Sequence, residues 1–272
     1  MRTVQMEYLR PEELVEERER CPIVYLPVGP LEWHGPAMPL GTDPLAAQEL
    51  ARRAALCTGG VVMPTVFFGT ERDRPTDILA AKGFPDAGNM YVLGMDVPKN
   101  CYKSFYAREE IFALMIREYL RLLVQEEYKL IVIVNGHGAW GQKGSLERLA
   151  VEFSHETPSR VIALMPDVMP AGEEADFGHG TKVETSLMRY LFDEDVDLDA
   201  LPPRGEPIKY TDYGIADDFV FSCKRSPNDA VVYDPRDATP ELGRKMFDVN
   251  LAKLCETVQE TYKSITQKNG GK

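Results

Sequence analysis

Three side chains that can bind a metal ion lie close together near the start of the chain. Glu32, His34 and Asp43 fall within twelve residues, just after an apolar run, Ile23–Val28, that indicates a buried strand. Glu32 and His34 are two residues apart, so in extended backbone their side chains leave on the same face. Two carboxylates and an imidazole suit zinc, manganese or iron(II) better than calcium, which prefers all-oxygen shells. This stretch therefore predicts a transition-metal site.

The placement of the histidines supplies further candidate ligands. The chain has four histidines, and besides His34 two of them lie beside glycines. His137 follows the apolar run Leu130–Val134 in an Asn-Gly-His-Gly sequence, and His179 lies between two glycines, five residues before Glu184. Glycine lets the backbone adopt turns that other residues rarely adopt. Histidines in such turns, beside acidic residues, favour metal binding.

Short apolar runs rich in β-branched residues alternate along the chain with amphipathic segments. This alternation is typical of an α/β fold with a largely parallel sheet. The expected strands are Ile23–Val28, Val61–Phe68, Leu130–Val134 and Val161–Met165. The expected helices are Pro44–Cys57, Arg108–Glu126, Lys143–Glu156, Glu184–Phe192 and Pro240–Thr266. Two long segments, Glu71–Lys103 and Leu201–Arg236, show no such periodicity. In α/β enzymes segments of this kind usually line or cover a site.

Parallel α/β sheets bind ligands beyond the carboxyl ends of their strands. The strand expected at 23–28 leads into Glu32 and His34, and the strand expected at 130–134 leads into His137. Two distant parts of the sequence therefore deliver candidate ligands to one edge of the sheet.

Composition limits the class of protein and its partners. The 272 residues are 44% hydrophobic and 27% charged, which is enough for one large core. No linker-like stretch divides the chain, so we expect one domain over residues 1–267 and a flexible tail over 268–272. The formal net charge of −12 argues against binding nucleic acid through its phosphates and against adhesion to an anionic membrane.

Cysteine usage and hydropathy indicate the compartment. The five cysteines are widely spaced and form no CxxC pattern, which indicates reduced thiols and neither a disulfide framework nor a Cys-type zinc site. The N-terminal residues contain no apolar signal core, and no apolar run reaches the roughly 18 residues of a transmembrane helix. We therefore expect a soluble, cytoplasmic protein.

Several motifs occur in order along the chain: Leu26–Pro36, Pro39–Asp43, Asn135–Gly138, His179 with Glu184–Ser186, and Asp237–Gly243. Together they resemble the creatininase (creatinine amidohydrolase-like) family across essentially the whole chain. The resemblance implies a three-layer α/β/α fold and a cytosolic, metal-dependent hydrolase that holds two divalent ions of zinc, manganese or iron. It also implies a homo-oligomer, often a hexamer.

The resemblance also implies roles for the candidate residues. It makes Asp43 a bridge between two ions and places His179 near the scissile bond, where a histidine can carry a proton. Two cations a few ångströms apart can activate a water molecule and polarise a carbonyl group. Glu184 would complete this catalytic site. The implied metal ligands are Glu32, His34, Asp43, His137 and Glu184.

Two positions depart from the family pattern. Many members carry a further histidine three residues after the first, where this chain has Ala37. Creatininase itself has a glutamate ligand where this chain has Ala139. We therefore do not expect creatinine to be the substrate. Because other members open different bonds, the expected reaction is ring opening of a small, polar cyclic carbonyl compound, either a cyclic amide or an oxidised inositol-type diketone.

Four residues are candidates for contact with the substrate. Trp33 and Trp140 lie beside the motif histidines, where an aromatic ring could line a pocket. Arg72 and Arg74 lie in the charged stretch Glu71–Arg74, which we expect to be a solvated loop. Their guanidinium groups could bind substrate oxygens.

Two alternatives of a different class remain open. Gly136, Gly138 and Gly141 form a GxGxxG pattern between an expected strand and an expected helix, which is typical of an NAD-binding oxidoreductase. That hypothesis leaves the acidic residues and His179 without a role. The second alternative is a non-catalytic, oligomeric binding protein, against which the complete set of candidate ligands argues.

Overall fold

The computed structural model describes residues 3–81, 86–96, 101–173, 179–204 and 234–269. Its centre is a parallel sheet with the strand order β2-β1-β6-β7, in which β3 also pairs with β1. This sheet contains β1 (Ile23–Gly29), β2 (Val61–Val62), β3 (Val66–Phe67), β6 (Leu130–Asn135) and β7 (Arg160–Leu164). A second, two-stranded parallel sheet joins β4 (Gly69–Thr70) to β5 (Tyr106–Ala107).

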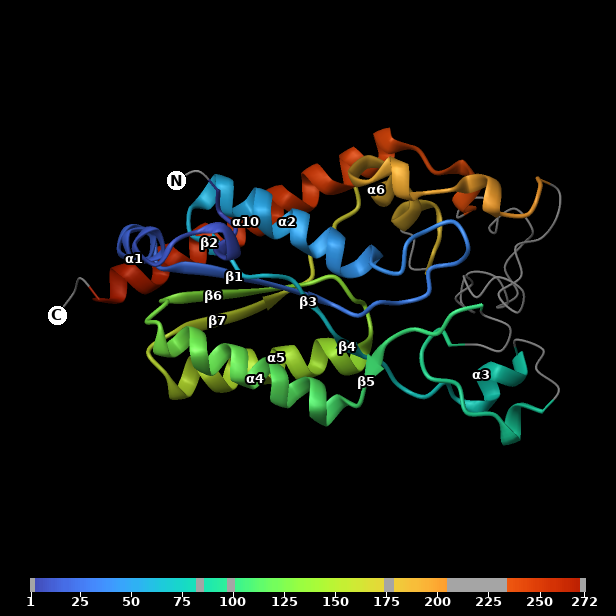
Figure 1. The fold of residues 1–272 in the computed structure, drawn as a ribbon, viewed down its shortest axis with the longest axis horizontal. Coiled ribbons are helices and arrows are strands. Elements are labelled where there is room, and N and C mark those ends of the chain that lie inside the picture. Colours follow the sequence, from blue (N-terminus) through green and yellow to red (C-terminus); the bar gives the residue numbers. More distant parts are fainter. Residues whose placement is uncertain (1–2, 82–85, 97–100, 174–178, 205–233, 270–272) are drawn as a thin grey trace.

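Helices cover both faces of the central sheet (Figure 1). One face carries α2 (Thr42–Thr58), α6 (Lys182–Leu191) and α10 (Pro240–Asn269), and the other carries α4 (Glu109–Gln125) and α5 (Trp140–Glu156). The predicted α/β fold, with helices on both sides of a largely parallel sheet, is confirmed. The other described helices are α1 (Pro11–Arg20), α3 (Thr76–Ala81) and the 3-10 helices η1 (Met6–Tyr8), η2 (Ala87–Asn89), η3 (Asp193–Asp195), η4 (Leu198–Ala200) and η5 (Pro235–Asp237).

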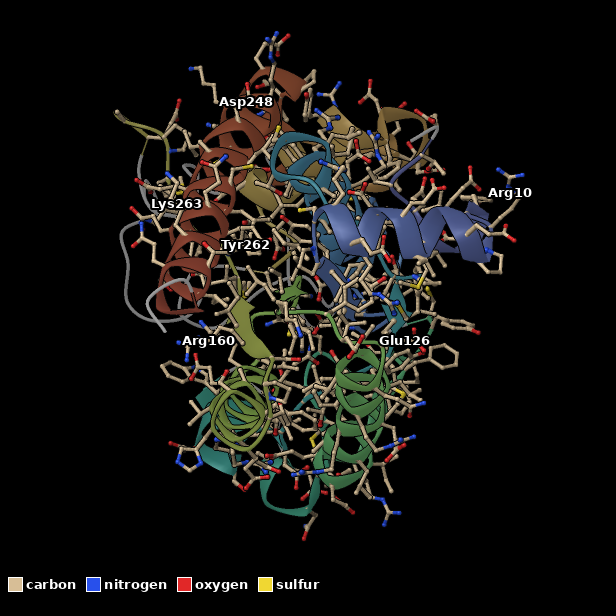
Figure 2. The ribbon with its side chains drawn as sticks, turned by 90° about the vertical axis from the view of Figure 1, so that its left-hand side faces the viewer. Arg10, Glu126, Arg160, Asp248, Tyr262 and Lys263 are labelled. Atoms are coloured by element: carbon tan, nitrogen blue, oxygen red, sulfur yellow. The ribbon has the colours of Figure 1, made fainter. Side chains whose placement is uncertain are left out.

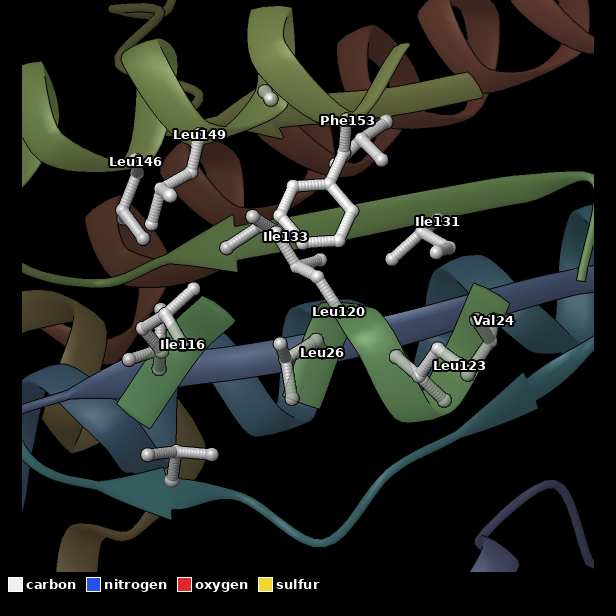
Figure 3. Close-up of a cluster of buried hydrophobic side chains, with 14 of the residues drawn as sticks. Val24, Leu26, Ile116, Leu120, Leu123, Ile131, Ile133, Leu146, Leu149 and Phe153 are labelled. Carbon is white, nitrogen blue, oxygen red and sulfur yellow. The ribbon is translucent and has the colours of Figure 1, made fainter. Parts of the chain in front are cut away.

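Alternate residues of β1 pack against opposite helix layers. Val24 and Leu26 belong to a buried cluster with Leu120 of α4, shown in Figure 3. Tyr25 belongs to the cluster on the other face, with Phe247 of α10. Because successive strand side chains point to opposite faces, burial on both sides holds β1 firmly between the layers. The loop that follows its carboxyl end therefore starts from a fixed point.

Helix α1 lies at the end of the molecule that faces the viewer in Figure 2. There Arg18 donates hydrogen bonds to the backbone carbonyl of Glu126, over 2.8 Å, and to its side chain, over 3.0 Å. The sequence pattern did not predict this helix, because Leu14 and Val15 are the apolar residues among its otherwise charged side chains after Pro11. Proline at the first helical position is nevertheless a typical helix start.

The predicted strand Val61–Phe68 is wrong as a single element. It is divided into β2 and β3, with Pro64 between them. Proline has no backbone N–H to donate to a ladder and so interrupts a strand inside a sheet. Both short strands still pair with β1, with Val61 opposite Val24 in β2 and Val66 as the first paired residue of β3.

Other differences concern the ends of elements and the segments predicted to be irregular. Helix α5 begins at Trp140, earlier than predicted, and α10 extends to Asn269. The segment Glu71–Lys103 contains α3, so it is not wholly irregular. Most of Leu201–Arg236 lies outside the described residues. Residues 270–272 also lie outside them, and the predicted tail stays a prediction.

Gly136 lets the loop after β6 approach the start of α2. A Cβ atom on Gly136 would lie 2.1 Å from the backbone oxygen of Asp43, so any other residue would displace the backbone. Gly29, the last residue of β1, allows a similar close approach, since a Cβ atom there would lie 2.9 Å from the backbone nitrogen of Pro44. These two close approaches bring His137 next to the first turn of α2.

Two further observations bear on the expected environment. None of the described helices is long and apolar enough to cross a membrane. The cysteines among the described residues are free thiols, as predicted: Cys21, Cys57, Cys101 and Cys255. Cys223 lies outside the described residues.

Candidate metal centre

The structure brings all five predicted ligands to the carboxyl edge of the sheet. Glu32 and His34 lie in the loop after β1, and His137 lies in the loop after β6. Asp43 and Glu184 lie in the first turns of α2 and α6. The exposed fractions of Glu32, His34, Asp43 and His137 are 2%, 1%, 5% and 3%. Buried charges are costly unless they are paired or bind a metal, so this cluster needs compensating protons or cations.

The ring of His34 is oriented by the backbone. Its Nδ1 lies 3.0 Å from the carbonyl oxygen of Glu32. A carbonyl oxygen accepts hydrogen bonds and cannot donate them, so Nδ1 carries the proton in the neutral ring and Nε2 carries the lone pair. Such a hydrogen bond from the far ring nitrogen is the usual way in which proteins orient a metal-binding histidine.

Nε2 of His34 lies within hydrogen-bond distance of a carboxylate oxygen but is not aligned with it as in an ordinary hydrogen bond. It lies 3.1 Å from Oδ1 of Asp43, yet it is a buried nitrogen that has no hydrogen-bond partner among the described residues. Two lone pairs that face each other repel unless a proton or a cation lies between them. This arrangement is what a metal site needs, because ligand atoms about 2.1 Å from one ion lie roughly 3.0–3.4 Å apart.

Asp43 lies between the two buried histidines. Its Oδ1 faces His34, whereas its Oδ2 lies 2.9 Å from Nδ1 of His137. The same Nδ1 is 3.0 Å from Oε2 of Glu32. Nε2 of His137 is also buried and lacks a hydrogen-bond partner in the described part of the chain. A carboxylate whose two oxygens face different imidazoles has the geometry of a bridge between two ions.

The five predicted ligands are divided between two groups of three, one of which also contains Glu71. Glu32, Glu71 and His137 make one group, and His34, Asp43 and Glu184 make the other. Within each group, one ligand atom from every residue lies within 4.8 Å of the others. Each group has enough ligand atoms to hold one ion, and the mixture of imidazole and carboxylate suits zinc, manganese or iron. The residues present therefore fit the metals that the sequence predicted.

Protons can supply the compensating charge as well as cations. Although burial opposes the charged form, Asp43 raises the pKa of His34 to about 10. In the same way Glu32 raises the pKa of His137 well above its usual range, against the effect of burial. Burial opposes ionisation of Glu32, yet His137 and its neighbours hold the pKa of Glu32 well below its usual range. Protons and metal cations therefore compete for the same nitrogens.

Glu184 is tied to the turn that precedes its helix. Its Oε2 accepts a hydrogen bond from the backbone N–H of Gly180, which has a positive φ of 66°. Burial raises the pKa of Glu184 to about 8, with His34 opposing and Asp43 adding to the shift. A cation in the group with His34 and Asp43 would favour its ionised form.

His179 lies beside the histidine of the first motif. The ring centroids of His34 and His179 are 4.2 Å apart, and Nε2 of His179 donates a hydrogen bond of 2.6 Å to the carbonyl of Trp33. Nδ1 of the neutral ring therefore carries the lone pair. Burial, followed by the charge of His34, lowers the pKa of His179 to about 4, so the ring is neutral at pH 7. His179 also forms a ligand-like group with Glu32 and His34.

Of these residues, Glu32, Asp43, His137, His179 and Glu184 line a cavity of about 560 Å³. Such a volume suits a small-molecule ligand. Around the acidic centre the wall includes two cationic side chains, Arg74 and Lys143. Ala139 is buried in the same wall and provides no ligand atom. The cavity therefore combines a polar, metal-binding floor with cations that can meet substrate oxygens.

Of the four residues predicted to contact the substrate, two line the cavity. Trp140 and Arg74 line the cavity, with Trp140 82% exposed at its rim. Nε of Arg74 donates to the carbonyl of Gly94 over 2.8 Å. Trp33 and Arg72 are not among the described lining residues. Trp33 is buried and contributes its backbone carbonyl to His179, so its predicted pocket-lining role finds no support in its position.

Some residues of the site escaped sequence reasoning. Tyr106 donates its hydroxyl to Oε1 of Glu32, and no local motif around Tyr106 predicted this contact. Asn135 holds the next loop, since its side chain donates to the carbonyl of His137 over 2.7 Å and accepts from the backbone N–H of His137 over 3.2 Å. An asparagine two residues before a histidine in a glycine turn is a typical signal for such a turn. Glu71, expected in a solvated loop, lines the cavity.

Comparison with known proteins places the chain among relatives with the same fold. The creatininase (creatinine amidohydrolase) family model matches residues 7–83 and 94–258. Creatinine amidohydrolase from Pseudomonas putida is 23% identical over 88% of this chain and 90% of its own length. The mycofactocin precursor peptide peptidase of Mycolicibacterium smegmatis is 28% identical over 66% of this chain and 62% of its own length.

Solved structures agree with this assignment of the fold. A structure described as manganese creatininase has a TM-score of 0.66 at 21% identity and covers 96% of this chain and 99% of its own. A putative creatinine amidohydrolase from Bacteroides fragilis has a TM-score of 0.65 at 20% identity and covers 96% of both chains. The NAD-binding alternative loses its basis, because His137, the second residue of that glycine pattern, faces the carboxylates of Glu32 and Asp43. This chain belongs to the creatininase family of metal-dependent hydrolases.

Proposed function

We propose that this protein opens a small, polar cyclic carbonyl compound by hydrolysis, with two divalent ions of zinc, manganese or iron bound at its centre. The observation that carries the proposal is the position of Asp43, whose two oxygens face His34 and His137. The facing atoms are Nδ1 of His137 and Nε2 of His34, and this Nε2 is buried without a hydrogen-bond partner among the described residues. The proposed ligands are Glu32, His34, Asp43, His137 and Glu184.

The chain's own residues would divide the remaining work. When bound, the ions would polarise the substrate carbonyl and lower the pKa of a water molecule. His179 is held by the carbonyl of Trp33 at Nε2, so its Nδ1 is the atom that would accept a proton from the water and pass it to the leaving atom. Glu184, with its pKa raised by burial, would bind metal as a carboxylate beside this histidine.

The reaction adds water across one bond of a ring. The hydroxyl group is added to the carbonyl carbon and the proton to the leaving atom. A cyclic amide would give a carboxylic acid and an amine, and a cyclic polyol diketone would give a carboxylic acid and a ketone with a new C–H bond. Two named relatives, a creatinine amidohydrolase and a peptide peptidase, support the amide. Arg74 and Lys143 in the cavity wall favour the oxygen-rich diketone.

A parallel assay of candidate substrates tests the reaction. The protein, loaded with manganese or zinc, would be incubated with creatinine, with other small cyclic amides and with oxidised inositols, and ring opening would be followed by mass spectrometry as a gain of one water. We expect turnover of a cyclic amide or a diketone, with creatinine a poor substrate. Metal binding without turnover of any class would instead favour the non-catalytic binding protein.

We also propose a cytoplasmic homo-oligomer, with a hexamer as the expected state. Several large aromatic side chains are exposed near the cavity and in the segment that precedes β5, which is typical of surfaces that contact another subunit. They are Tyr91, Tyr102, Phe105 and Trp140. Light scattering of the purified protein at micromolar concentration measures the assembly, and a monomer would contradict the proposal.

A further inference from the structure

Glu71 lies beside the metal centre, directly after a short strand, and not in a solvated loop. It follows directly after β4, which pairs in parallel with β5 so that Gly69 lies opposite Tyr106. In Figure 1 this small sheet lies just beyond the ends of β1 and β6, between the central sheet and α3. β5 carries Tyr106, which binds Glu32, and β4 leads straight into Glu71. The small sheet therefore delivers two side chains to the metal centre.

A chain of buried hydrogen bonds fixes Glu71 relative to His137. The backbone N–H of Thr70 donates to Oε1 of Gln142 over 2.9 Å. Nε2 of Gln142 donates to Oδ1 of Asn135 over 2.8 Å, and that oxygen also accepts from the backbone N–H of His137. Gln142 is fully buried. Buried hydrogen-bond networks of this kind hold their members in one geometry, so the residue before Glu71 and the backbone of His137 are connected through two side chains.

The side chain of Glu71 is turned inward beneath a tight turn. Gly94 has a positive φ of 55°, and a Cβ atom there would lie 2.4 Å from Cγ of Glu71 and 2.8 Å from the ring of Tyr106. The turn therefore needs glycine both for its backbone and for the space that Glu71 occupies. One carboxylate oxygen, Oε1, accepts a 2.7 Å hydrogen bond from the backbone N–H of Arg72. The remaining oxygen can serve as a ligand.

The group around His137 is also short of ligands without Glu71. Oε1 of Glu32 accepts from Tyr106, and Oε2 of Glu32 faces His137. Ala139, two residues beyond His137, is buried and has no ligand atom. Nε2 of His137 is buried and has no partner in the described chain. Divalent ions in such mixed sites take four to about six ligands, and Glu71 has a ligand atom within 4.8 Å of those of Glu32 and His137.

We propose that Glu71 is a metal ligand of the ion held by Glu32 and His137, and that it supplies a further carboxylate to this end of the site. The inference rests on the proposed metal-dependent function. A third carboxylate beside Glu32 and Asp43 gives this site a hard, oxygen-rich character. Oxygen ligands suit manganese more than zinc, so this ion is the more manganese-selective of the two.

Metal content measured by elemental analysis tests the proposal. Wild type, Glu71→Gln and the control Asp77→Asn would be dialysed against a competing chelator and then titrated with manganese. Asp77 is an exposed residue of α3 in the same stretch of chain. Asp77→Asn removes one carboxylate, as Glu71→Gln does, and so controls for the change in charge. We expect two ions in wild type and in the control. Glu71→Gln should retain the ion of His34, Asp43 and Glu184 but bind the other at least roughly tenfold more weakly, because even changes outside the ligand set cost about 10–100-fold.

The outcomes separate this inference from the proposed function. If the wild-type protein bound no metal, both the proposed function and the proposed role of Glu71 would be refuted. Two ions bound equally tightly by wild type and Glu71→Gln would overturn the role of Glu71 alone, and a raised KM with unchanged metal content would reassign Glu71 to substrate binding. Should Glu71→Gln fail to fold, a crystal structure of the manganese-loaded wild type decides the matter. A Glu71 oxygen about 2.0–2.4 Å from an ion is expected, and a separation beyond hydrogen-bond distance would overturn the proposal.

Discussion

Tyr106 and Glu32 are joined by a hydrogen bond between the tyrosine hydroxyl and Oε1 of the carboxylate. The other oxygen of Glu32 lies 3.0 Å from Nδ1 of His137. Burial, together with the charge of Glu32, raises the pKa of Tyr106 well above its usual value. The hydroxyl is therefore a permanent donor at any physiological pH, and it turns the second oxygen of Glu32 toward the histidine.

Tyr106→Phe should weaken metal binding without unfolding the chain. The substitution keeps the ring, which packs near Gly94, and removes the donor to Glu32. Loss of a hydrogen bond that orients a ligand costs roughly 10–100-fold in metal affinity. Titration with manganese against a fluorescent chelator measures the effect. Tyr102→Phe, which changes an exposed tyrosine, is the control. Equal affinities in the two variants would show that Glu32 needs no orienting donor.

Asp43→Asn should remove more metal than the loss of any neighbouring carboxylate. Its two oxygens face His34 and His137, whereas Glu184 belongs to one group of candidate ligands and Oε2 of Glu32 lies 3.0 Å from His137 but 3.9 Å from His34. We therefore expect Glu32→Gln and Glu184→Gln each to lose one ion, and Asp43→Asn to lose both. Elemental analysis gives the stoichiometry, with the exposed Asp195→Asn as control. An Asp43→Asn protein that folds and retains one tightly bound ion would argue against a bridging role.

Most of the metal centre could be predicted because its residues follow strand signals locally. Glu32 and His34 come after β1, and His137 comes after β6, two strands buried on both faces and therefore apolar over most of their length. Since the carboxyl ends of parallel strands meet at one edge, the sequence alone predicted that these loops converge. Asp43 was found as part of the same short motif.

Glu71 and Tyr106 could not be found in this way. Glu71 directly follows β4, and Tyr106 lies in β5. Each of these strands is two residues long, which is too short to show an alternation of apolar and polar residues. Their pairing joins segments more than thirty residues apart in the chain, and nothing local in either segment specifies the other. The same lack of periodicity concealed α1, whose residues are mostly charged.

His179 should act on protons and not primarily hold metal. Its Nε2 is engaged by the carbonyl of Trp33, and its lowered pKa keeps the ring neutral and able to accept a proton. His179→Gln should keep its metal and lose about 10²–10⁴ in turnover, the usual range for a general acid–base group. Activity and metal content would be measured on the same samples, with the exposed His155→Gln as control. Loss of an ion in His179→Gln would instead make His179 a ligand, as its proximity to Glu32 and His34 allows.

The metal-free protein should lose stability as the pH rises from 7 to 9. In that state Asp43, against the effect of burial, raises the pKa of His34 to about 10 from 6.5. Burial raises the pKa of Glu184 to about 8 from 4.5. Between pH 6.5 and about 10 for His34, and between pH 4.5 and about 8 for Glu184, the folded chain binds more protons than the unfolded chain. The free energy of unfolding therefore falls with rising pH in these windows. His179 has a lowered pKa, and it contributes the opposite slope only below about pH 6.5.

Thermal unfolding at pH 7, 8 and 9, in chelator and in excess manganese, measures this dependence. We expect Tm in chelator to fall across the series and the fall to shrink or reverse with manganese, because the ion binds the deprotonated ligands that a higher pH provides. The whole chain carries a net charge of −12, and general repulsion adds a slope of the same sign. His34→Gln separates the two causes, since it keeps the general repulsion and loses the local proton. A metal-free His34→Gln protein with the same slope as wild type would show that the buried histidine does not hold that proton.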